Sequence, residues 1–459
     1  MKIIIVGMSH RGMRLADLLA QEGHDVVAVD NNRAKIDYVT DEYSVSGVVG
    51  SGVAKEVLLA AGAETADVIV AMSHIDEVNL MTCMIAKKCG TRFAAARIFQ
   101  PELSKNKDSL KEDFLIDYLI NPKLETADQI VRQIGFPGKI KVDAFFDNNA
   151  TMIRLTVEKN TFAKEVMKLS EVKQFFGTDM LITNVLRDGK MIIPDGDFEI
   201  KEKDVLSIIA GDAEIQNIIL RLGMIKKPAK KVFIVGGGDI AYYLSKRLLE
   251  QKLQVTVMEY NMNRCKELSE LLPGAKIVFA DGLKADILLE EGIEDTDVCI
   301  SLTGSDENNL VISLFAWSLG IPSIITKVDS ADYEKLLNRV NMDITVSPSV
   351  ITVDGMLRFV RDMTVYNENG QDIASVHQVA GGLAQAIEFS VFENCKKIGI
   401  PLKSPSFGLK KHLLIAMIVR GEKCLIPDGN DTIQVGDRVV VIAASKTKTA
   451  LNTINDIFE

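Results

Sequence analysis

The sequence is poor in the residues that form metal sites and disulfides. It has five histidines and six cysteines, and no histidine lies near a second histidine or a cysteine pair at ligand spacing. Only Cys83 and Cys89 are close in sequence, and six positions apart on a helix they would point in different directions. Scattered cysteines are typical of reduced thiols in a cytosolic protein. We therefore expect neither a metal site nor a disulfide.

Clustered positive charge is also missing. The formal net charge is -10 and the pI about 5.3, with no basic block anywhere in the chain. Binding to nucleic acid requires clustered Lys and Arg to neutralise phosphates, so nucleic acid is not an expected partner. Hydrophobic residues make up 47% and charged residues 25%, which is ordinary for a soluble globular protein.

Long hydrophobic runs are almost absent. The N-terminal apolar run is too short for the core of a signal peptide. One uncharged stretch, Asn308 to Thr326, is about long enough to span a membrane, but it contains several polar residues together with Gly320 and Pro322. Gly-x-Pro predicts the end of a helix followed by a strand. We therefore expect a soluble chain without a membrane span.

What the sequence has in abundance is internal repetition. "KIIIVGMSHRGMRLADLLAQEGHDVVAVD" at residues 2–30 matches "KVFIVGGGDIAYYLSKRLLEQKLQVTVME" at 231–259. A second, unrelated unit also repeats, at residues 185–211 and 418–444. The chain therefore has the order A-B-A-B, and its 459 residues are too many for one core.

The two units predict two kinds of domain. Unit A has apolar strands near residues 2–6, 25–29, 68–72 and 93–97, separated by amphipathic helices, which predicts a Rossmann-like, doubly wound parallel sheet. Unit B is shorter, with alternating strands and a Pro-Asp-Gly turn at residues 194–196 and 427–429, which predicts a small α+β domain. The expected fold is α/β, with each Rossmann-like domain followed by a small α+β domain.

Each unit A opens with a glycine turn between a strand and a helix. In G-x-G-x-x-G/A turns the first glycine makes the turn, the second admits a pyrophosphate, and the third packs helix against strand. The second copy matches with Gly236, Gly238 and Ala241, whereas the first has Gly7, Ser9 and Gly12. Ser9 either crowds the pyrophosphate or donates its hydroxyl to it. We therefore expect the two sites to differ in ligand preference. Gly12→Val and Gly238→Val should abolish binding of different nucleotides, or of one nucleotide that binds the two sites with distinct affinities.

An acidic residue ends the next strand in both copies, Asp30 in the first and Glu259 in the second. Such an acid accepts hydrogen bonds from the ribose hydroxyls and repels a 2′-phosphate. This pattern favours NAD(H) or adenosine nucleotides over NADP(H). The alternative is that both carboxylates are solvated residues at strand ends.

Other polar residues follow the third, fourth and fifth strands, where ligands bind in such folds. For each of them an ordinary role as a loop residue is as probable as a binding role. The candidates are Ser51 and Asp281 after the third strand, Ser73, His74 and Thr303 after the fourth, and Arg97 and Lys327 at the end of the fifth.

A catalytic role is not favoured. A dehydrogenase needs an acid/base or a metal opposite its nicotinamide, but unit B contains no cysteine cluster, and the histidines of one half have no counterpart in the other. We therefore predict a ligand-binding regulator rather than an enzyme. An NAD-dependent oxidoreductase remains as an alternative.

The repeated motifs "TADVIVAMSHIDEVNL" and "PDGDFEIKEKDVLSIIAG" resemble those of the Trk-type tandem members of the family of domains that regulate potassium conductance (RCK domains). The resemblance covers essentially the whole chain. It implies a cytoplasmic protein, peripheral to the inner face of the cell membrane, that gates an integral potassium-translocating subunit of the TrkH/TrkG type. NAD(H) and ATP/ADP would be its ligands, and four chains would form a homotetrameric ring. A regulator of a different cation transporter is the alternative within this fold.

The resemblance also implies domain limits and site residues. The limits are a nucleotide-binding domain at 1–122, a crossover helix at 123–138, a small domain at 139–225, a second nucleotide-binding domain at 229–348, a crossover helix and linker at 349–378, and a second small domain at 379–459. Which nucleotide opens the channel, and whether the small domains bind cyclic di-AMP or an ion, stays open. In the first copy the implied site residues are Gly7, Met8, Ser9, His10, Arg11, Asp30, Ser73, His74 and Arg97, and in the second Gly236, Gly237, Gly238, Asp239, Ile240, Glu259, Asp281, Thr303 and Lys327.

Overall fold

The computed structural model describes most of the chain. The described residues are 1–134, 136, 140–146, 150–159, 161–162, 167–223, 229–330, 333, 337, 344–369, 373–379, 384–421, 423–444, 451 and 453–459. They form two compact units: one holds residues 1–134 and 229–363, and the other residues 135–228 and 364–459.

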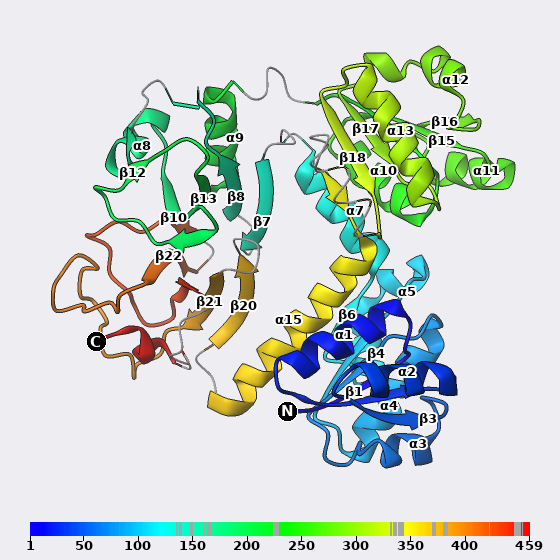
Figure 1. Cartoon of the computed structure of the whole chain (residues 1–459), viewed down its shortest axis with the longest axis horizontal. Coiled ribbons are helices and arrows are strands. Elements are labelled where there is room, and N and C mark those ends of the chain that lie inside the picture. The colour runs from blue at the N-terminus through cyan, green and yellow to red at the C-terminus, as the bar shows by residue number, and fades with distance from the viewer. Residues whose placement is uncertain are drawn as a thin grey trace. The chain divides into compact units, whose positions relative to one another are not determined.

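The first compact unit contains two doubly wound parallel sheets, as the sequence predicts (Figure 1). The order of the first is β3-β2-β1-β4-β5-β6, and that of the second is β16-β15-β14-β17-β18-β19. β-Branched residues such as Ile3, Ile4 and Ile5 fill both faces of the central strand and are fully buried. The first sheet comprises β1 (Lys2–Val6), β2 (Asp25–Asp30), β3 (Ser46–Val49), β4 (Val68–Ala71), β5 (Phe93–Arg97) and β6 (Tyr118–Ile120), and the second β14 (Lys231–Val235), β15 (Gln254–Glu259), β16 (Lys276–Phe279), β17 (Val298–Ser301), β18 (Ser323–Lys327) and β19 (Thr345–Val346).

Helices connect the strands and cover both sheets. The strand order reverses between β1 and β4 and between β14 and β17, and ligands bind at such switch points, outside the carboxyl ends of the strands. The first sheet carries α1 (His10–Gln21), α2 (Arg33–Glu42), α3 (Lys55–Ala60), α4 (Asp76–Cys89), α5 (Pro101–Lys105) and α6 (Lys107–Asp113), and the second α10 (Asp239–Glu250), α11 (Met262–Leu271), α12 (Ala285–Glu290), η1 (Ile293–Asp295) and α13 (Asp306–Ser318).

The helix that follows each parallel sheet packs on the other parallel sheet. Helix α7 (Pro122–Gln133) follows the first sheet, but it lies against α10, and its Ala127 and Ile130 belong to the core of the second sheet (Figure 1). Helix α15 (Pro348–Asn369) follows the second sheet, but its Met356 and Val360 are fully buried in the core of the first. Each parallel sheet is therefore completed by a helix that follows the other sheet in the chain.

The second compact unit contains two antiparallel sheets, one from each unit B, as expected for small α+β domains. Strand β20 begins at residue 373, so the second small sheet starts before the limit of 379 that the resemblance implied. The first domain has β7 (Ile140–Phe146), β8 (Ala150–Thr156), β9 (Met167–Lys168), β10 (Met180–Arg187), β11 (Lys190–Ile192), β12 (Glu199–Ile200) and β13 (Val205–Gly211), with α8 (Leu169–Phe176) and α9 (Asp212–Arg221), and the second has β20 (Ile373–Val379), β21 (Ala384–Ser390), β22 (Leu413–Arg420), β23 (Lys423–Leu425) and β24 (Arg438–Ala444), with η3 (Ile454–Ile457).

The same ion pair holds each small domain together. Arg187 donates from two nitrogens to the buried carboxylate of Asp204, both at 2.7 Å, and Arg420 does the same to Asp437 at 2.8 Å. Bidentate pairs of this kind are geometrically specific. The aspartate that precedes the last strand of each unit B, Asp204 before β13 and Asp437 before β24, therefore has a structural role.

The uncharged stretch at 308–326 does not form one long helix. Helix α13 ends at Ser318 and strand β18 begins at Ser323, as Gly320 and Pro322 predict. Within the described part of the chain, no helix combines the length and the apolar character needed to cross a membrane.

Candidate functional site

The two glycine turns lie at the carboxyl ends of the central strands β1 and β14. Gly7 and Gly236 have φ values of 102° and 106°, a left-handed conformation that favours glycine. A Cβ on Gly7 would lie 2.7 Å from the backbone nitrogen of Ser73, and one on Gly236 would lie 2.7 Å from the carbonyl of Leu302. Each turn is thus packed against the loop that follows the neighbouring strand, with a helix beginning directly after it.

The second position of the motif differs between the copies. A Cβ on Gly238 would meet nothing within 4 Å, so the space next to this residue is open. In the first copy the position is Ser9, whose buried Oγ has no hydrogen-bond partner among the described residues. Of the two alternatives for Ser9, this geometry favours the one in which its hydroxyl donates to a ligand.

The acids at the strand ends are fixed beneath the turns. Asp30 Oδ2 accepts from the backbone N–H of Met8 at 2.7 Å, and Glu259 Oε2 accepts from that of Gly237 at the same distance. Their second oxygens accept from the N–H groups of Asn32 and Asn261. Glu259 is only 8% exposed. These contacts do not fit the interpretation that the two carboxylates are solvated strand ends.

Two buried asparagines that the sequence analysis missed fix the loops after β4 and β17. Asn79 accepts from the N–H of Ser73 at 2.8 Å and donates to the carbonyl of Arg97 at 2.8 Å. Asn309 makes the same contacts with Thr303 (2.7 Å) and Lys327 (3.0 Å). The aligned repeats "DEVNL" and "DENNL" held the signal, since both copies place an asparagine there.

Arg97 presents unused hydrogen-bond donors at the edge of the first sheet. Its Nη2 donates to the carbonyls of Met72 and Ser73, both at 2.9 Å, whereas its buried Nε and Nη1 have no partner in the described structure. Burial and the nearby Arg11 lower the pKa of Arg97 to about 10, an effect that Asp76 opposes. An anion would satisfy both the free N–H groups and the buried charge. Its counterpart Lys327 is only half-buried.

The remaining candidates contribute less. His10, Ser51, His74 and Asp281 are exposed in the loops or helix starts where the sequence placed them. The side chain of Met8 is buried in the core of the first sheet, so only its backbone faces the turn. Ile240 likewise packs against the core of the second sheet.

Each turn also receives contacts from the opposite half of the chain. Arg11 donates from Nε to Ser349 Oγ at 2.8 Å, and its Nη2 lies 3.6 Å from Asp329 Oδ2. In the second turn Asp239 pairs with Lys123, which stands at the start of α7. No local pattern in the sequence indicates these contacts, because the partners are far apart along the chain.

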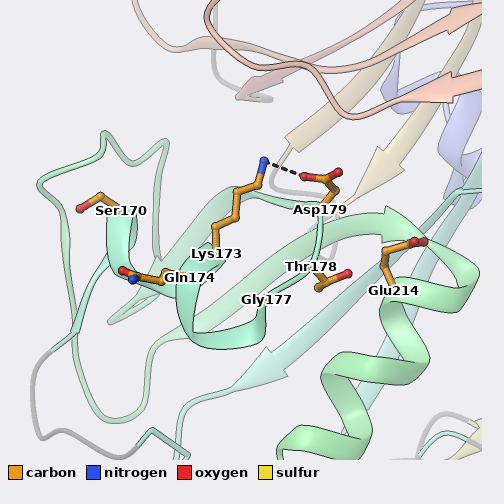
Figure 2. A pocket seen from close by; sticks show the side chains of 7 residues that line it. All are labelled: Ser170, Lys173, Gln174, Gly177, Thr178, Asp179 and Glu214. Atoms are coloured by element: carbon orange, nitrogen blue, oxygen red, sulfur yellow. Dashed lines mark ion pairs between the residues drawn. The ribbon is translucent and has the colours of Figure 1, made fainter.

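The first small domain has a surface pocket of its own. Figure 2 shows α8 and α9 facing it, with Lys173 paired to Asp179 at 2.7 Å. Glu214 adds a second carboxylate. Because the single ammonium is already paired, the lining does not favour an anionic ligand such as a cyclic dinucleotide. The lining residues are Ser170, Lys173, Gln174, Gly177, Thr178, Asp179 and Glu214.

Comparison with known proteins agrees with this architecture. The family model of the TrkA-N domain matches residues 3–122 and 232–348, and that of the TrkA-C domain matches residues 386–452. The chain is 32% identical over 446 residues to the "Trk system potassium uptake protein TrkA homolog" of Archaeoglobus fulgidus, covering 96% of this chain and 97% of that protein. It is also 32% identical to the "Trk system potassium uptake protein TrkA" of Haemophilus influenzae, covering 97% and 96% of the two chains.

The chain belongs to the TrkA family. This membership confirms the resemblance drawn from the repeated motifs, and it confirms the expectation of a regulatory protein of potassium transport rather than an enzyme.

Solved structures confirm the fold of this TrkA-family chain. The "GsuK channel bound to NAD" aligns with a TM-score of 0.62 at 17% identity, covering 97% of this chain and 77% of that one. The "GsuK RCK domain" aligns equally well at 16% identity, covering 97% and 92%. The chain therefore shares the fold of these structures over 97% of its length.

Proposed function

We propose that this TrkA-family chain is a nucleotide-sensing regulatory subunit that gates a membrane potassium uptake channel or transporter. Its ligands are NAD(H) and ATP/ADP, bound at the two glycine turns. The observation that carries the proposal is the anchored carboxylate beneath each turn, Asp30 in one copy and Glu259 in the other, next to a helix start without a side-chain cap. Pyrophosphate binds such a terminus, and the carboxylate accepts from the ribose hydroxyls.

The residues proposed for binding are those at the switch point of each sheet. Arg97, with two unused donors, offers the first site a contact for a phosphate. Gly238, with open space beside it, admits the pyrophosphate in the second. His74, Ser51 and Asp281 remain proposed contacts on the rim.

The proposed partner is an integral potassium-translocating subunit of the TrkH/TrkG type, with the chain at the cytoplasmic face of the membrane. The relatives are named as potassium uptake proteins, which supports this assignment. A nucleotide shifts a gate only if it binds two arrangements of the protein with different affinity. The exchange of α7 and α15 joins both nucleotide-binding domains within one unit, as such a shift requires.

Calorimetric titration of the purified full-length protein with NAD⁺, NADH, ATP, ADP and cyclic di-AMP tests the nucleotide assignment. We expect binding of NAD(H) and of ATP or ADP. If NAD⁺, NADH, ATP and ADP all fail to bind, the nucleotide assignment is overturned. Co-purification from membranes of the native organism tests the partner. Recovery of a potassium-transport subunit supports the assignment, and recovery of a different cation transporter contradicts it.

A further inference from the structure

The second glycine turn carries a charge that opposes the binding of an anion. Asp239 is the first residue of α10 and follows Gly238 directly. Its carboxylate therefore lies at the helix end that attracts negative charge, where it competes with a bound phosphate. The equivalent residue in the first copy is His10, which has no negative charge. Binding of an anion at the second site therefore requires that the charge of Asp239 be neutralised, whereas the first site has no such charge at this position.

Two cations neutralise Asp239, one on each carboxylate oxygen. Arg264 of α11 lies 3.0 Å from Oδ1 and also donates to the carbonyl of Gly237 at 2.8 Å. Lys123 lies 2.5 Å from Oδ2. Arg264 belongs to the same half of the chain as the turn, whereas Lys123 comes from the first half. Arg264 is also paired with Glu267 at 2.8 Å, so the two cations and two carboxylates together carry no net charge, and loss of Lys123 would leave one negative charge.

The first half holds Lys123 in this position. Asn121 accepts from the backbone N–H of Lys123 at 3.0 Å and donates to the hydroxyl of Tyr243 on α10 at 3.3 Å. The Lys123 ammonium lies 5.4 Å from the centre of the Phe99 ring, and the Arg97 guanidinium lies 4.5 Å from the same ring. Lys123 is therefore fixed between the edge of the first site and the turn of the second.

We infer that Lys123 is a positioning residue of the second nucleotide site, supplied by the opposite half of the chain. By neutralising Asp239 it removes the negative charge that would repel a nucleoside diphosphate. This inference rests on the proposed function, namely that the second turn binds a nucleotide. It assigns to the second site a residue that lies outside the second nucleotide-binding domain in sequence.

Calorimetry with ADP on the full-length protein tests the inference. Gly238→Val identifies the binding step of the second site, because a side chain there would occupy the open space beside the turn where the proposed pyrophosphate binds. We expect Lys123→Gln to weaken that step by about tenfold, as the loss of one partly solvated charge suggests. Lys123→Arg keeps most of the affinity, and Lys123→Gln/Asp239→Asn restores it, because the second change removes the repelling carboxylate.

The matched control is Arg247→Gln. Arg247 pairs with Asp128 at 3.1 Å across the same contact between α7 and α10, but it does not contact the turn. An equal loss of ADP affinity in Arg247→Gln would assign the effect to helix packing and overturn the inference. Suppose that ADP binds to the wild type and that Gly238→Val removes one binding step. If Lys123→Gln then leaves that step unchanged, this inference fails but the proposed function stands. If the wild-type protein binds no nucleotide at all, the proposed function itself fails.

Discussion

At the scale of single residues, Gly12 and Gly238 belong to corresponding motifs, but the space around each glycine is different. A Cβ on Gly12 would lie 2.1 Å from the carbonyl oxygen of Gly7, whereas one on Gly238 would meet no atom within 4 Å. From the sequence, Gly12→Val and Gly238→Val are expected to abolish binding of different nucleotides, or of one nucleotide at distinct affinities. The structure adds that Gly12→Val also disturbs the packing of helix on strand.

We therefore expect Gly238→Val to abolish nucleotide binding at the second site without lowering the melting temperature. Gly12→Val should destabilise the protein by about 1–3 kcal/mol or more, as overpacking does. Thermal unfolding measured beside calorimetric titration separates the two effects. A large fall in the melting temperature of Gly238→Val would contradict the open space at that position.

The anchored carboxylates predict selectivity between dinucleotides. A 2′-phosphate would approach Asp30 or Glu259, and the repulsion between like charges should favour NADH over NADPH by roughly a hundredfold. Asp30→Asn/Glu259→Gln should reduce this preference, because neutral amides no longer repel the phosphate. Titration of both proteins with both dinucleotides measures the ratio, and equal affinities in the wild type would show the idea to be wrong.

Asp329 predicts a dependence of stability on pH. Burial tends to raise its pKa, but hydrogen bonds from Ser347 and Ser349, together with the nearby Arg11, lower it below the usual value. The contribution of an acid with a lowered pKa is present above the pKa of the unfolded state, and it is lost as the pH falls through the folded value. Asp329→Asn should therefore be less stable than wild type at neutral pH, and the difference should vanish in acid.

Urea unfolding at neutral and acid pH checks this prediction. Glu270→Gln is a suitable control, because Glu270 is an exposed acid on α11. A difference between Asp329→Asn and wild type that persists unchanged in acid would show that the ionised carboxylate is not its source.

At the scale of elements, the exchange of crossover helices makes the two nucleotide-binding domains interdependent. Met356 of α15 is fully buried in the core of the first sheet, and Phe359 stacks on Tyr118 with ring centres 5.2 Å apart. A chain that lacked the second half would leave this face of the first sheet covered by α1 without α15. Folding of the first domain therefore depends on residues that follow it by more than half the chain.

Met356→Ala should lower the free energy of unfolding by about 2–5 kcal/mol, as do large-to-small changes in a core. Val350 lies on the same helix but is 52% exposed, so Val350→Ala should change stability by no more than about 0.5 kcal/mol. Chemical denaturation of both variants provides the comparison. Equal small effects would mean that α15 does not complete the first core.

At the scale of the whole molecule, helix α13 presents an unpaired apolar face. Val311 and Trp317 are each 54% exposed, and Leu314 is 37% exposed on the same helix. The equivalent helix α4 has Lys87 where α13 has Trp317, so the two halves offer different surfaces. This difference is consistent with a ring in which the apolar face of α13 contacts the second half of a neighbouring copy of the chain.

We predict a homotetramer in solution, in which this face of α13 is covered by another copy of the chain. Light scattering with and without NAD⁺ and ATP measures its mass, and a monomer under all conditions would refute the prediction. Trp317→Lys should yield a smaller species, because burying an unpaired charge is costly. Val435 is similarly exposed in the second small domain, and Val435→Lys should leave the assembly intact.

The sequence by itself determined the repeated order of domains, the parallel sheets and the position of both glycine turns. These features depend on local signals: β-branched runs, helical periodicity, and glycines that must adopt a conformation few other residues tolerate. Internal repetition strengthened these signals, because the strands of the first parallel sheet recur in the second. The repeats also held the pair Asn79 and Asn309, although their role as loop anchors was not recognised from the sequence.

Only the tertiary structure decided which sheet each crossover helix covers and which charges meet at each turn. Periodicity predicts that α7 and α15 have an apolar face, but either sheet could bury it with the same gain in free energy. The partners of Arg11 and Asp239 follow from that choice of sheet, since Ser349 and Lys123 stand at the starts of the exchanged helices. Contacts between residues so far apart leave no pattern in one sequence, because they depend on packing rather than on local conformation.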